Sequence, residues 1–255
     1  LVKIIFLLNE LNKDKYTKDI LKHLATENIA NGSEVLAAEL ATNISRYDFA
    51  IQISKLASYQ KRFHNGFNYP IISTPKFING RKIPESAFIL SIIRQESEFD
   101  LTANSSAGAK GLMQLMPYTA RRISKGLNLE YSKSKLTKNP QYNVILGSAY
   151  LDILLSKYNG SYILTLAAYN AGESRVSAWI KKYGDPRKDD ISAIDWIELI
   201  PFKETRNYVQ RVLENVQVYS FIENNNTPQP YSILEDINRG YVGGKTIIKP
   251  VKKNS

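Results

Sequence analysis

RQESEFDLTANSSAGAKGLMQLMP, residues 94–117, carries the most informative pattern in this chain. A glutamate pair precedes serine, alanine and glycine residues that cannot continue a helix, and the only two methionines, Met113 and Met116, flank a glutamine. Small residues let the backbone approach a ligand closely, while thioethers and an amide give adaptable apolar contact and hydrogen bonding. The pattern favours a groove for a bulky, neutral, polar substrate. Core packing of one methionine is the alternative.

The residues before this segment predict a helix over 84–99 with Pro84 in its first turn. Three isoleucines mark its apolar face, and Glu96 lies three, four and seven residues after them, on the same face. Burial and the C-terminal end of a helix both push a carboxyl group toward its neutral form. A neutral carboxylic acid near pH 7 suits general acid catalysis of glycosidic cleavage. A helix cap, or an ion pair with Arg94, is the structural alternative.

The composition excludes several kinds of site. The 255 residues include no cysteine, which excludes disulfides, cysteine-based metal sites and thiol nucleophiles. The two histidines, His23 and His64, stand far apart without partners at metal-ligand spacing. A Ser-His-Asp triad is therefore poorly supported, and neither a metal nor another cofactor is expected.

Charge and hydropathy bear on the partners. A net charge of +10 keeps nucleic acid, anionic membranes and acidic cell-wall polymers open, and a merely cationic surface is the alternative. The basic residues form no single face with interleaved aromatic side chains, so no nucleic-acid partner is expected. No apolar run reaches the roughly 18 residues of a transmembrane segment. The opening LVKIIFLLNELNK has too short an apolar core for a signal sequence, so we expect an amphipathic helix in a processed or trimmed chain.

Helical periodicity dominates and no series of strands alternates with it, so the predicted fold is all-α. Residues 1–61 repeat apolar side chains every three or four positions, like stacked helical hairpins, with an N-cap expected at Ser33. Glycines and prolines predict an extended linker over 62–81, with a domain boundary near Gly80.

Residues 82–223 are predicted to form a second helical domain. The tail, 224–255, is rich in asparagine, proline and glycine and is expected to hold a short strand or docked segment near 246–248. Beyond the helix at 84–99, further helices are expected at 117–125, 142–158, 162–169, 174–183 and 204–222.

Three blocks in this order resemble the soluble lytic murein transglycosylases. They are RQESEF with ANSSAGAKGLMQLMPYTAR, then LAAYNAGESRV at 166–176, then IPFKETRNYVQRVLENVQVY at 200–219. The resemblance covers roughly residues 82–222 and implies a lysozyme-like catalytic domain. The helices of 1–61 look like the last part of the α-superhelical region that precedes catalysis in this family, and 62–81 like its linker domain.

The resemblance implies cleavage of the β-1,4 bond between N-acetylmuramic acid and N-acetylglucosamine in peptidoglycan, leaving 1,6-anhydromuramoyl ends. Glu96 would protonate the glycosidic oxygen and then accept the proton of the muramoyl O6 hydroxyl. A sugar that supplies its own nucleophile fits the local sequence, because neither Glu98 nor Asp100 shares the helical face of Glu96. Glu98 is expected to be an ordinary solvated acid. Family positions that line the saccharide groove correspond to Ser105, Gln114, Met116, Thr119 and Tyr169.

Glu204 matches a second family acid that helps to hold the substrate, and helix capping is its alternative. Tyr169 has a core tyrosine as its alternative, and Asn170 is an outside candidate for contact. Glu173 departs from the proline that is frequent in the family. The implied partner is the peptidoglycan glycan strand, and the implied location is the periplasm. A hydrolytic lysozyme of the same fold and a non-catalytic wall-binding scaffold are the rival functions.

Overall fold

The computed structural model describes residues 1–27, 32–224 and 233–240. In these ranges helices dominate and the strands form a single short hairpin, so the all-α prediction is confirmed. Residues cluster in space into two compact units, Leu1–Gly147 and Ser148–Ser255. The sequence predicts a domain boundary near Gly80, which is not where these two units meet. The domain limits predicted from the sequence stay predictions.

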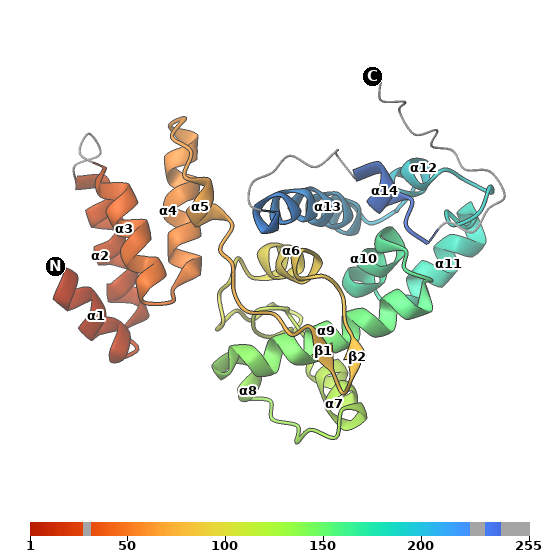
Figure 1. The fold of residues 1–255 in the computed structure, drawn as a ribbon, viewed down its shortest axis with the longest axis horizontal. Coiled ribbons are helices and arrows are strands. Elements are labelled where there is room, and N and C mark those ends of the chain that lie inside the picture. Colours follow the sequence, from red (N-terminus) through yellow and green to blue (C-terminus); the bar gives the residue numbers. More distant parts are fainter. Residues whose placement is uncertain (28–31, 225–232, 241–255) are drawn as a thin grey trace. The chain divides into compact units, whose positions relative to one another are not determined.

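Four helices begin the first unit. They are α1 (Val2–Glu10), α2 (Asp14–Glu27), α3 (Ser33–Asn43) and α4 (Tyr47–Tyr59) (Figure 1). Neighbouring helices pack together through apolar and small side chains, as the three-to-four spacing predicts. Buried members of their shared core include Ile5, Leu21, Ala37, Ala41 and Phe49.

The start of α3 differs from the predicted cap. Gly32 is the N-cap residue, with φ of 75°, and Ser33 is already helical. The Ser33 hydroxyl donates instead to the carbonyl oxygen of Ala25 in α2, at 3.5 Å. Glycine adopts this left-handed conformation without a steric penalty from a Cβ atom, so the turn assigns the cap to Gly32 and frees Ser33 to contact α2.

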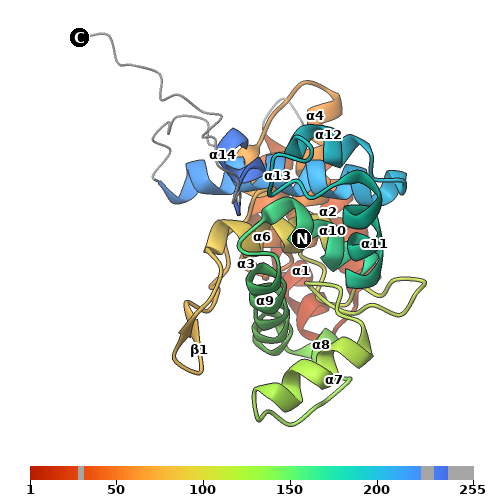
Figure 2. The same cartoon turned by 90° about the vertical axis from the view of Figure 1, so that its right-hand side faces the viewer.

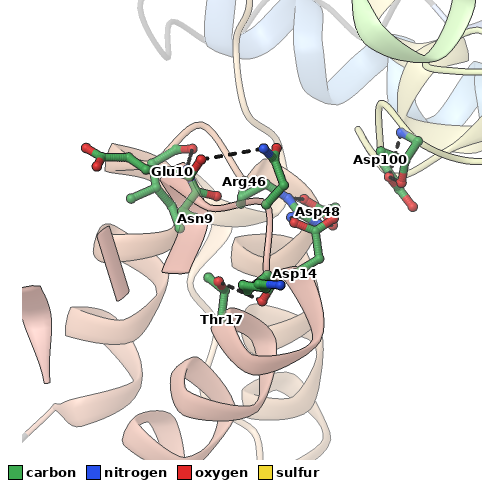
Figure 3. A network of polar contacts seen from close by, with 11 residues as sticks. Asn9, Glu10, Asp14, Thr17, Arg46, Asp48 and Asp100 are labelled. Atoms are coloured by element: carbon green, nitrogen blue, oxygen red, sulfur yellow. Dashed lines mark hydrogen bonds and ion pairs between the residues drawn. The ribbon is translucent and has the colours of Figure 1, made fainter. Parts of the chain in front are cut away.

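An arginine between α3 and α4 connects the N-terminal helices (Figure 3). Arg46 donates from Nε and Nη2 to the Asp48 carboxylate at 2.9 and 2.8 Å, and its Nη1 lies 2.6 Å from Asp14 Oδ1 in α2. The guanidinium lies over the Phe49 ring, 3.7 Å from the centroid. Burial raises the pKa of Asp48, against the lowering effect of Arg46. Arg46 therefore holds the start of α4 against α2.

The segment after α4 is mostly extended, as the glycines and prolines predict. It contains one turn of helix, α5 (Asn65–Asn68), and a hairpin of β1 (Phe77–Ile78) with β2 (Arg81–Lys82). The turn residues Asn79 and Gly80 have φ of 50° and 76°. Two successive positive φ angles are what a type I′ hairpin turn requires, which explains the Asn-Gly pair.

The first unit also contains a buried helix, α6 (Ser86–Glu96). Its residues 87–93 are all buried, including the polar Ser91, so α6 is buried on every side and not only along the predicted stripe. A long loop leads from α6 to α7 (Pro117–Gly126). The short α8 (Lys135–Lys138) and the first half of α9 (Pro140–Lys157) follow.

The second unit contains the end of α9 and five further helices. They are α10 (Tyr162–Ala171), α11 (Glu173–Tyr183), α12 (Ala193–Glu198), α13 (Lys203–Glu223) and α14 (Ile233–Ile237). The apolar α10 packs against α11, α13 and α14, and both views show α13 running past α10 (Figure 1, Figure 2).

Two small helices of the second unit, α12 and α14, are absent from the sequence prediction because each spans about one turn. The strand or docked segment expected at 246–248 lies outside the described residues. Among the helices that the structure describes, none combines the length and apolarity needed to cross a bilayer.

Candidate active site

The predicted acid, Glu96, is the last residue of α6. Ile89, Ile92 and Ile93, which precede it by seven, four and three positions, are each 0% exposed, and Glu96 itself is half-buried. The carboxyl group therefore stands half-buried beside an apolar helix face, at the negative end of the helix dipole. Local periodicity was sufficient to predict this position.

Glu98 is not the ordinary solvated acid that its position on the helix predicts. Lys55 Nζ in α4 lies 2.7 Å from Glu98 Oε1, and Arg94 Nη1 lies 3.4 Å from the same oxygen. The helix ends at Glu96, so helical spacing does not describe Glu98, and the turn directs its side chain toward the two cations. The same contacts occupy Arg94, the arginine considered as a partner of Glu96.

The loop after α6 is fastened to the end of that helix. The Ser97 hydroxyl donates to the carbonyl oxygen of Leu112 at 2.8 Å and to that of Ile93 at 3.3 Å. A single side chain next to Glu96 thus connects the last turn of α6 with the GLMQLM segment, which runs from Gly111 to Met116. This connection sets the GLMQLM segment beside the predicted acid.

Two predicted contact residues, Ser105 and Gln114, use their side chains to shape this loop. The Ser105 hydroxyl accepts a hydrogen bond from the Ala109 amide at 2.9 Å. Gln114 Nε2 donates to the carbonyl oxygens of Ala103 at 3.1 Å and Gly111 at 2.8 Å. Gln114 has φ of 44°, a conformation that costs energy in a residue with a Cβ and that these bonds help to hold.

A buried asparagine of α9 anchors the GLMQLM segment from the other side. Asn143 is 0% exposed, and its Oδ1 accepts from the Met113 amide at 2.9 Å. Its Nδ2 donates to the carbonyl oxygens of Lys110 and Leu136, both at 3.0 Å. One side chain therefore binds three backbone groups, although the Lys110 carbonyl oxygen also accepts from the Leu115 amide at 3.1 Å.

Glycines allow this close approach between the segment and α9. A Cβ atom on Gly147 would overlap the Met113 side chain, and one on Gly111 would overlap the Leu136 carbonyl oxygen and the Asn143 amide. Asn143 and Gly147 were missed in the sequence. The signal for both is that a polar asparagine and a glycine stand inside an apolar helix. Glycine costs about 1 kcal/mol there relative to alanine, and a buried asparagine needs hydrogen-bond partners.

The two methionines have different environments. Met113 is 0% exposed and packs under Gly147, so it is a core residue, whereas Met116 is 43% exposed as the N-cap of α7. Core packing of one methionine, the alternative drawn from the sequence, therefore holds for Met113, because the non-helical backbone between the two gives their side chains different exposures. Thr119, half-buried in the first turn of α7, lies near Met116 in the chain.

The other predicted contact residues belong to the second unit. Tyr169 is half-buried near the end of α10, and its ring centroid lies 5.4 Å from that of Tyr150 in α9. Glu204 is exposed in the first turn of α13, where the helix dipole favours a carboxylate. The next residue, Thr205, donates from Oγ1 to Asn170 Oδ1 at 2.6 Å. Asn170 therefore has a structural role in fastening α10 to α13.

Glu173, the departure from the family pattern, starts α11 directly after Gly172 and pairs with Lys157 at the end of α9. Gly172 has φ of 92° and serves both as C-cap of α10 and as N-cap of α11. This double role requires a residue without a Cβ. The ion pair supplies the contact that fixes the start of α11, where a carboxylate is favourable.

A cavity of about 270 Å³ lies among α2, α3 and α4, and none of the predicted site residues lines it. Among its polar lining residues is Glu34, which is 4% exposed. Arg62 Nε and His64 Nε2 lie 2.6 and 2.8 Å from Glu34 Oε1. The Arg62 hydrogen bond lowers the pKa of Glu34, so the carboxyl is an ionised structural partner of the linker.

Comparisons with known proteins agree with the resemblance found in the sequence. Residues 77–192 match the family described as the transglycosylase SLT domain, and residues 199–227 match the soluble lytic transglycosylase helical domain. A relative from Haemophilus influenzae is 32% identical over 92% of this chain and 38% of its own length. The soluble lytic murein transglycosylase of Escherichia coli is 33% identical over 72% of this chain and 28% of its own length.

Solved structures show the same likeness. The 70-kDa soluble lytic transglycosylase in complex with bulgecin A has a TM-score of 0.74 at 27% identity, with 89% of this chain and 36% of that chain covered. An inactive glutamate-to-glutamine mutant of lytic transglycosylase Slt from Pseudomonas aeruginosa has a TM-score of 0.61 at 33% identity, with 82% and 36% covered. The chain thus spans less than two fifths of each of these proteins.

Proposed function

The chain belongs to the soluble lytic murein transglycosylase family, and on this premise we propose that it cleaves peptidoglycan as a lytic transglycosylase. The bond broken is the β-1,4 linkage between N-acetylmuramic acid and N-acetylglucosamine, and the product carries a 1,6-anhydromuramoyl end. The observation that carries the proposal is the position of Glu96, half-buried at the end of α6 beside three fully buried isoleucines.

In the proposed reaction Glu96 acts first as an acid and then as a base. Its carboxyl proton passes to the glycosidic oxygen as the bond to the muramoyl C1 breaks. The carboxylate then accepts the proton of the muramoyl O6 hydroxyl as O6 bonds to C1 and closes the anhydro ring. Glu96 ends protonated, and no water is consumed.

Three observations support a mechanism with one acid. Glu98, the nearest other glutamate, is held by Lys55 and Arg94 and is not free to act on a substrate. The end of a helix and apolar neighbours both favour the protonated form that Glu96 needs for the first step. In the related Slt enzyme from Pseudomonas aeruginosa, a mutant with one glutamate replaced by glutamine is inactive.

We further propose substrate contacts for the other residues that the family resemblance implies. Met116, exposed at the start of α7, would give apolar contact to a sugar ring, with Thr119 beside it in the chain. Ser105 and Gln114 would act mainly through the backbone of the loop that they shape. From the second unit, Tyr169 would offer a ring face and a hydroxyl, and Glu204 a hydrogen-bond acceptor. The proposed location is the periplasm, where peptidoglycan is the partner.

The product distinguishes this function from its rivals. Purified peptidoglycan digested with the chain is expected to release muropeptides with anhydro ends, which weigh one water less than the reducing products of a lysozyme. Mass spectrometry of the soluble fraction measures this difference. Reducing ends would instead identify a hydrolase of the same fold. Binding to the wall without release of any fragment would identify a scaffold.

The two methionines provide a matched pair of substitutions. Met113→Ala removes a fully buried side chain and is expected to lower the free energy of unfolding by about 2–5 kcal/mol. Met116→Ala removes an exposed side chain and is expected to change it by less than about 0.5 kcal/mol, but to weaken binding of glycan strands. Urea unfolding and a binding titration measure both effects. A larger loss of stability in Met116→Ala would make Met116 a core residue.

A further inference from the structure

The turn that follows Glu96 has an unusual backbone. Glu98 and Phe99 have φ of 50° and 66°, two successive left-handed residues that are not glycine. Such a conformation is uncommon for residues with a Cβ atom and persists only where the surrounding structure holds it. Because the turn begins next to Glu96, whatever holds it also determines the direction in which the α6 end presents that carboxyl group.

Two side chains of α4 hold the turn. Lys55 Nζ lies 2.7 Å from Glu98 Oε1, and the Tyr47 ring meets the Phe99 ring edge-on with centroids 6.2 Å apart. Phe99 is 4% exposed, so this ring is packed and not merely nearby. Each of the two left-handed residues therefore has its own partner in α4.

The contacts of α4 lie along one face of that helix. Tyr47 and Lys55 are separated by two steps of four residues, with the fully buried Ile51 between them. At 1.5 Å per residue they stand about 12 Å apart along the helix axis. The turn is therefore held at two separate points by one rigid element, which restrains its rotation as well as its position.

The linker adds a third attachment through Arg94. This arginine donates from Nε to the carbonyl oxygen of Asn68 at 2.9 Å and from Nη2 to Asn68 Oδ1 at 3.2 Å. Its remaining Nη1 lies 3.4 Å from Glu98 Oε1. Glu98 is thus the point at which the last turn of α6, the linker and α4 meet.

We propose that Lys55 and Tyr47 of α4 are positioning residues for Glu96. By holding the left-handed turn at Glu98 and Phe99, they fix the carboxyl of Glu96 in the direction that proton transfer requires. The helical N-terminal region then contributes to the rate of the reaction through its hold on this turn. This inference rests on the proposed function, because it assigns Glu96 the role of the acid.

The test compares Lys55→Met, Tyr47→Leu and the double variant with two controls. Tyr59→Leu changes a tyrosine of the same helix that is 81% exposed, and Lys55→Arg keeps the cation. Initial rates on soluble glycan strands are expected to show a kcat about tenfold lower for the double variant, with KM unchanged. Lys55→Arg and Tyr59→Leu are expected to retain the wild-type kcat. A double variant that matches Tyr59→Leu in kcat would overturn the proposal.

A second measurement is independent of activity. The amides of Ser97 and Asp100 donate within the turn, to the carbonyl oxygens of Ile93 at 3.1 Å and Ser97 at 3.0 Å. In the double variant we expect their hydrogen exchange to become at least about fivefold faster, while exchange in α7 stays as in the wild type. Unchanged exchange at these amides would overturn the proposal, and so would an equal acceleration throughout the first unit, which indicates general destabilisation.

The outcomes separate this inference from the proposed function. If the wild-type chain releases anhydro products and the Lys55 and Tyr47 variants do so at the same rate, only the positioning role fails. If the wild-type chain and Glu96→Gln release equally little product, the proposed function fails. The exchange measurement then still reports whether α4 holds the turn.

Discussion

Glu96→Gln is expected to lower the rate of glycan cleavage by about a thousandfold or more while the fold stays intact. General acid–base catalysis by one positioned group contributes about 10²–10⁴ in rate, and in the proposed reaction Glu96 supplies both the proton donor and the base. Glutamine keeps the shape of the side chain at the end of α6 but has no proton to give near pH 7. Release of soluble muropeptides over time measures the rate.

Glu39→Gln is the matched control, because it makes the same chemical change at an exposed position of α3. It is expected to keep both the activity and the melting temperature of the wild type. Glu96→Gln should keep the melting temperature of the wild type but lose the activity. Activity of Glu96→Gln within tenfold of the control would contradict the catalytic role, and a fall of several degrees in its melting temperature would point to a structural role.

Asn143→Ala is expected to lower the free energy of unfolding by about 3–5 kcal/mol. The substitution removes three hydrogen bonds and leaves the Met113 amide and the Leu136 carbonyl oxygen without this partner, while the Lys110 carbonyl oxygen keeps the Leu115 amide at 3.1 Å. Each buried polar group that loses its partner costs about 1–3 kcal/mol, with partial relief where the structure relaxes. The GLMQLM segment would loosen beside Glu96, so activity should fall as well.

Urea unfolding followed by circular dichroism measures the loss. Asn43→Ala, at the exposed end of α3, is the control and should change the free energy by less than about 0.5 kcal/mol. Asn143→Asp is informative because it keeps the acceptor for the Met113 amide and loses both donors. If Asn143→Ala unfolds at the same urea concentration as the control, Asn143 does not anchor the segment.

The position of Glu96 could be predicted because it depends on spacing within one helix. The isoleucines three, four and seven residues earlier define the buried face, and no distant contact is needed to place the acid on it. The same reasoning failed for Glu98, two residues later. There the helix has ended, φ is 50°, and the partner Lys55 stands 43 residues earlier in the chain.

Met113 and Asn143 show a second limit. In a loop the direction of a side chain follows from backbone angles that the sequence does not state, so the sequence could not decide whether Met113 packs in the core, where it is fully buried. Two of the three contacts of Asn143 lie 30 and 33 residues away. Asn143 and Gly147 are visible in the sequence as unusual residues of an apolar helix. The sequence does not show that Met113 is the residue that both of them contact.

The anchoring of Met113 by α9 has a consequence for synthesis on the ribosome. Asn143 follows Met113 by 30 residues, so the nascent chain holds Glu96 and the GLMQLM segment well before it holds their anchor. Until α9 emerges, the Met113 side chain lacks its buried site and remains available to chaperones. The GLMQLM segment can therefore take up its anchored conformation only after α9 has been synthesised.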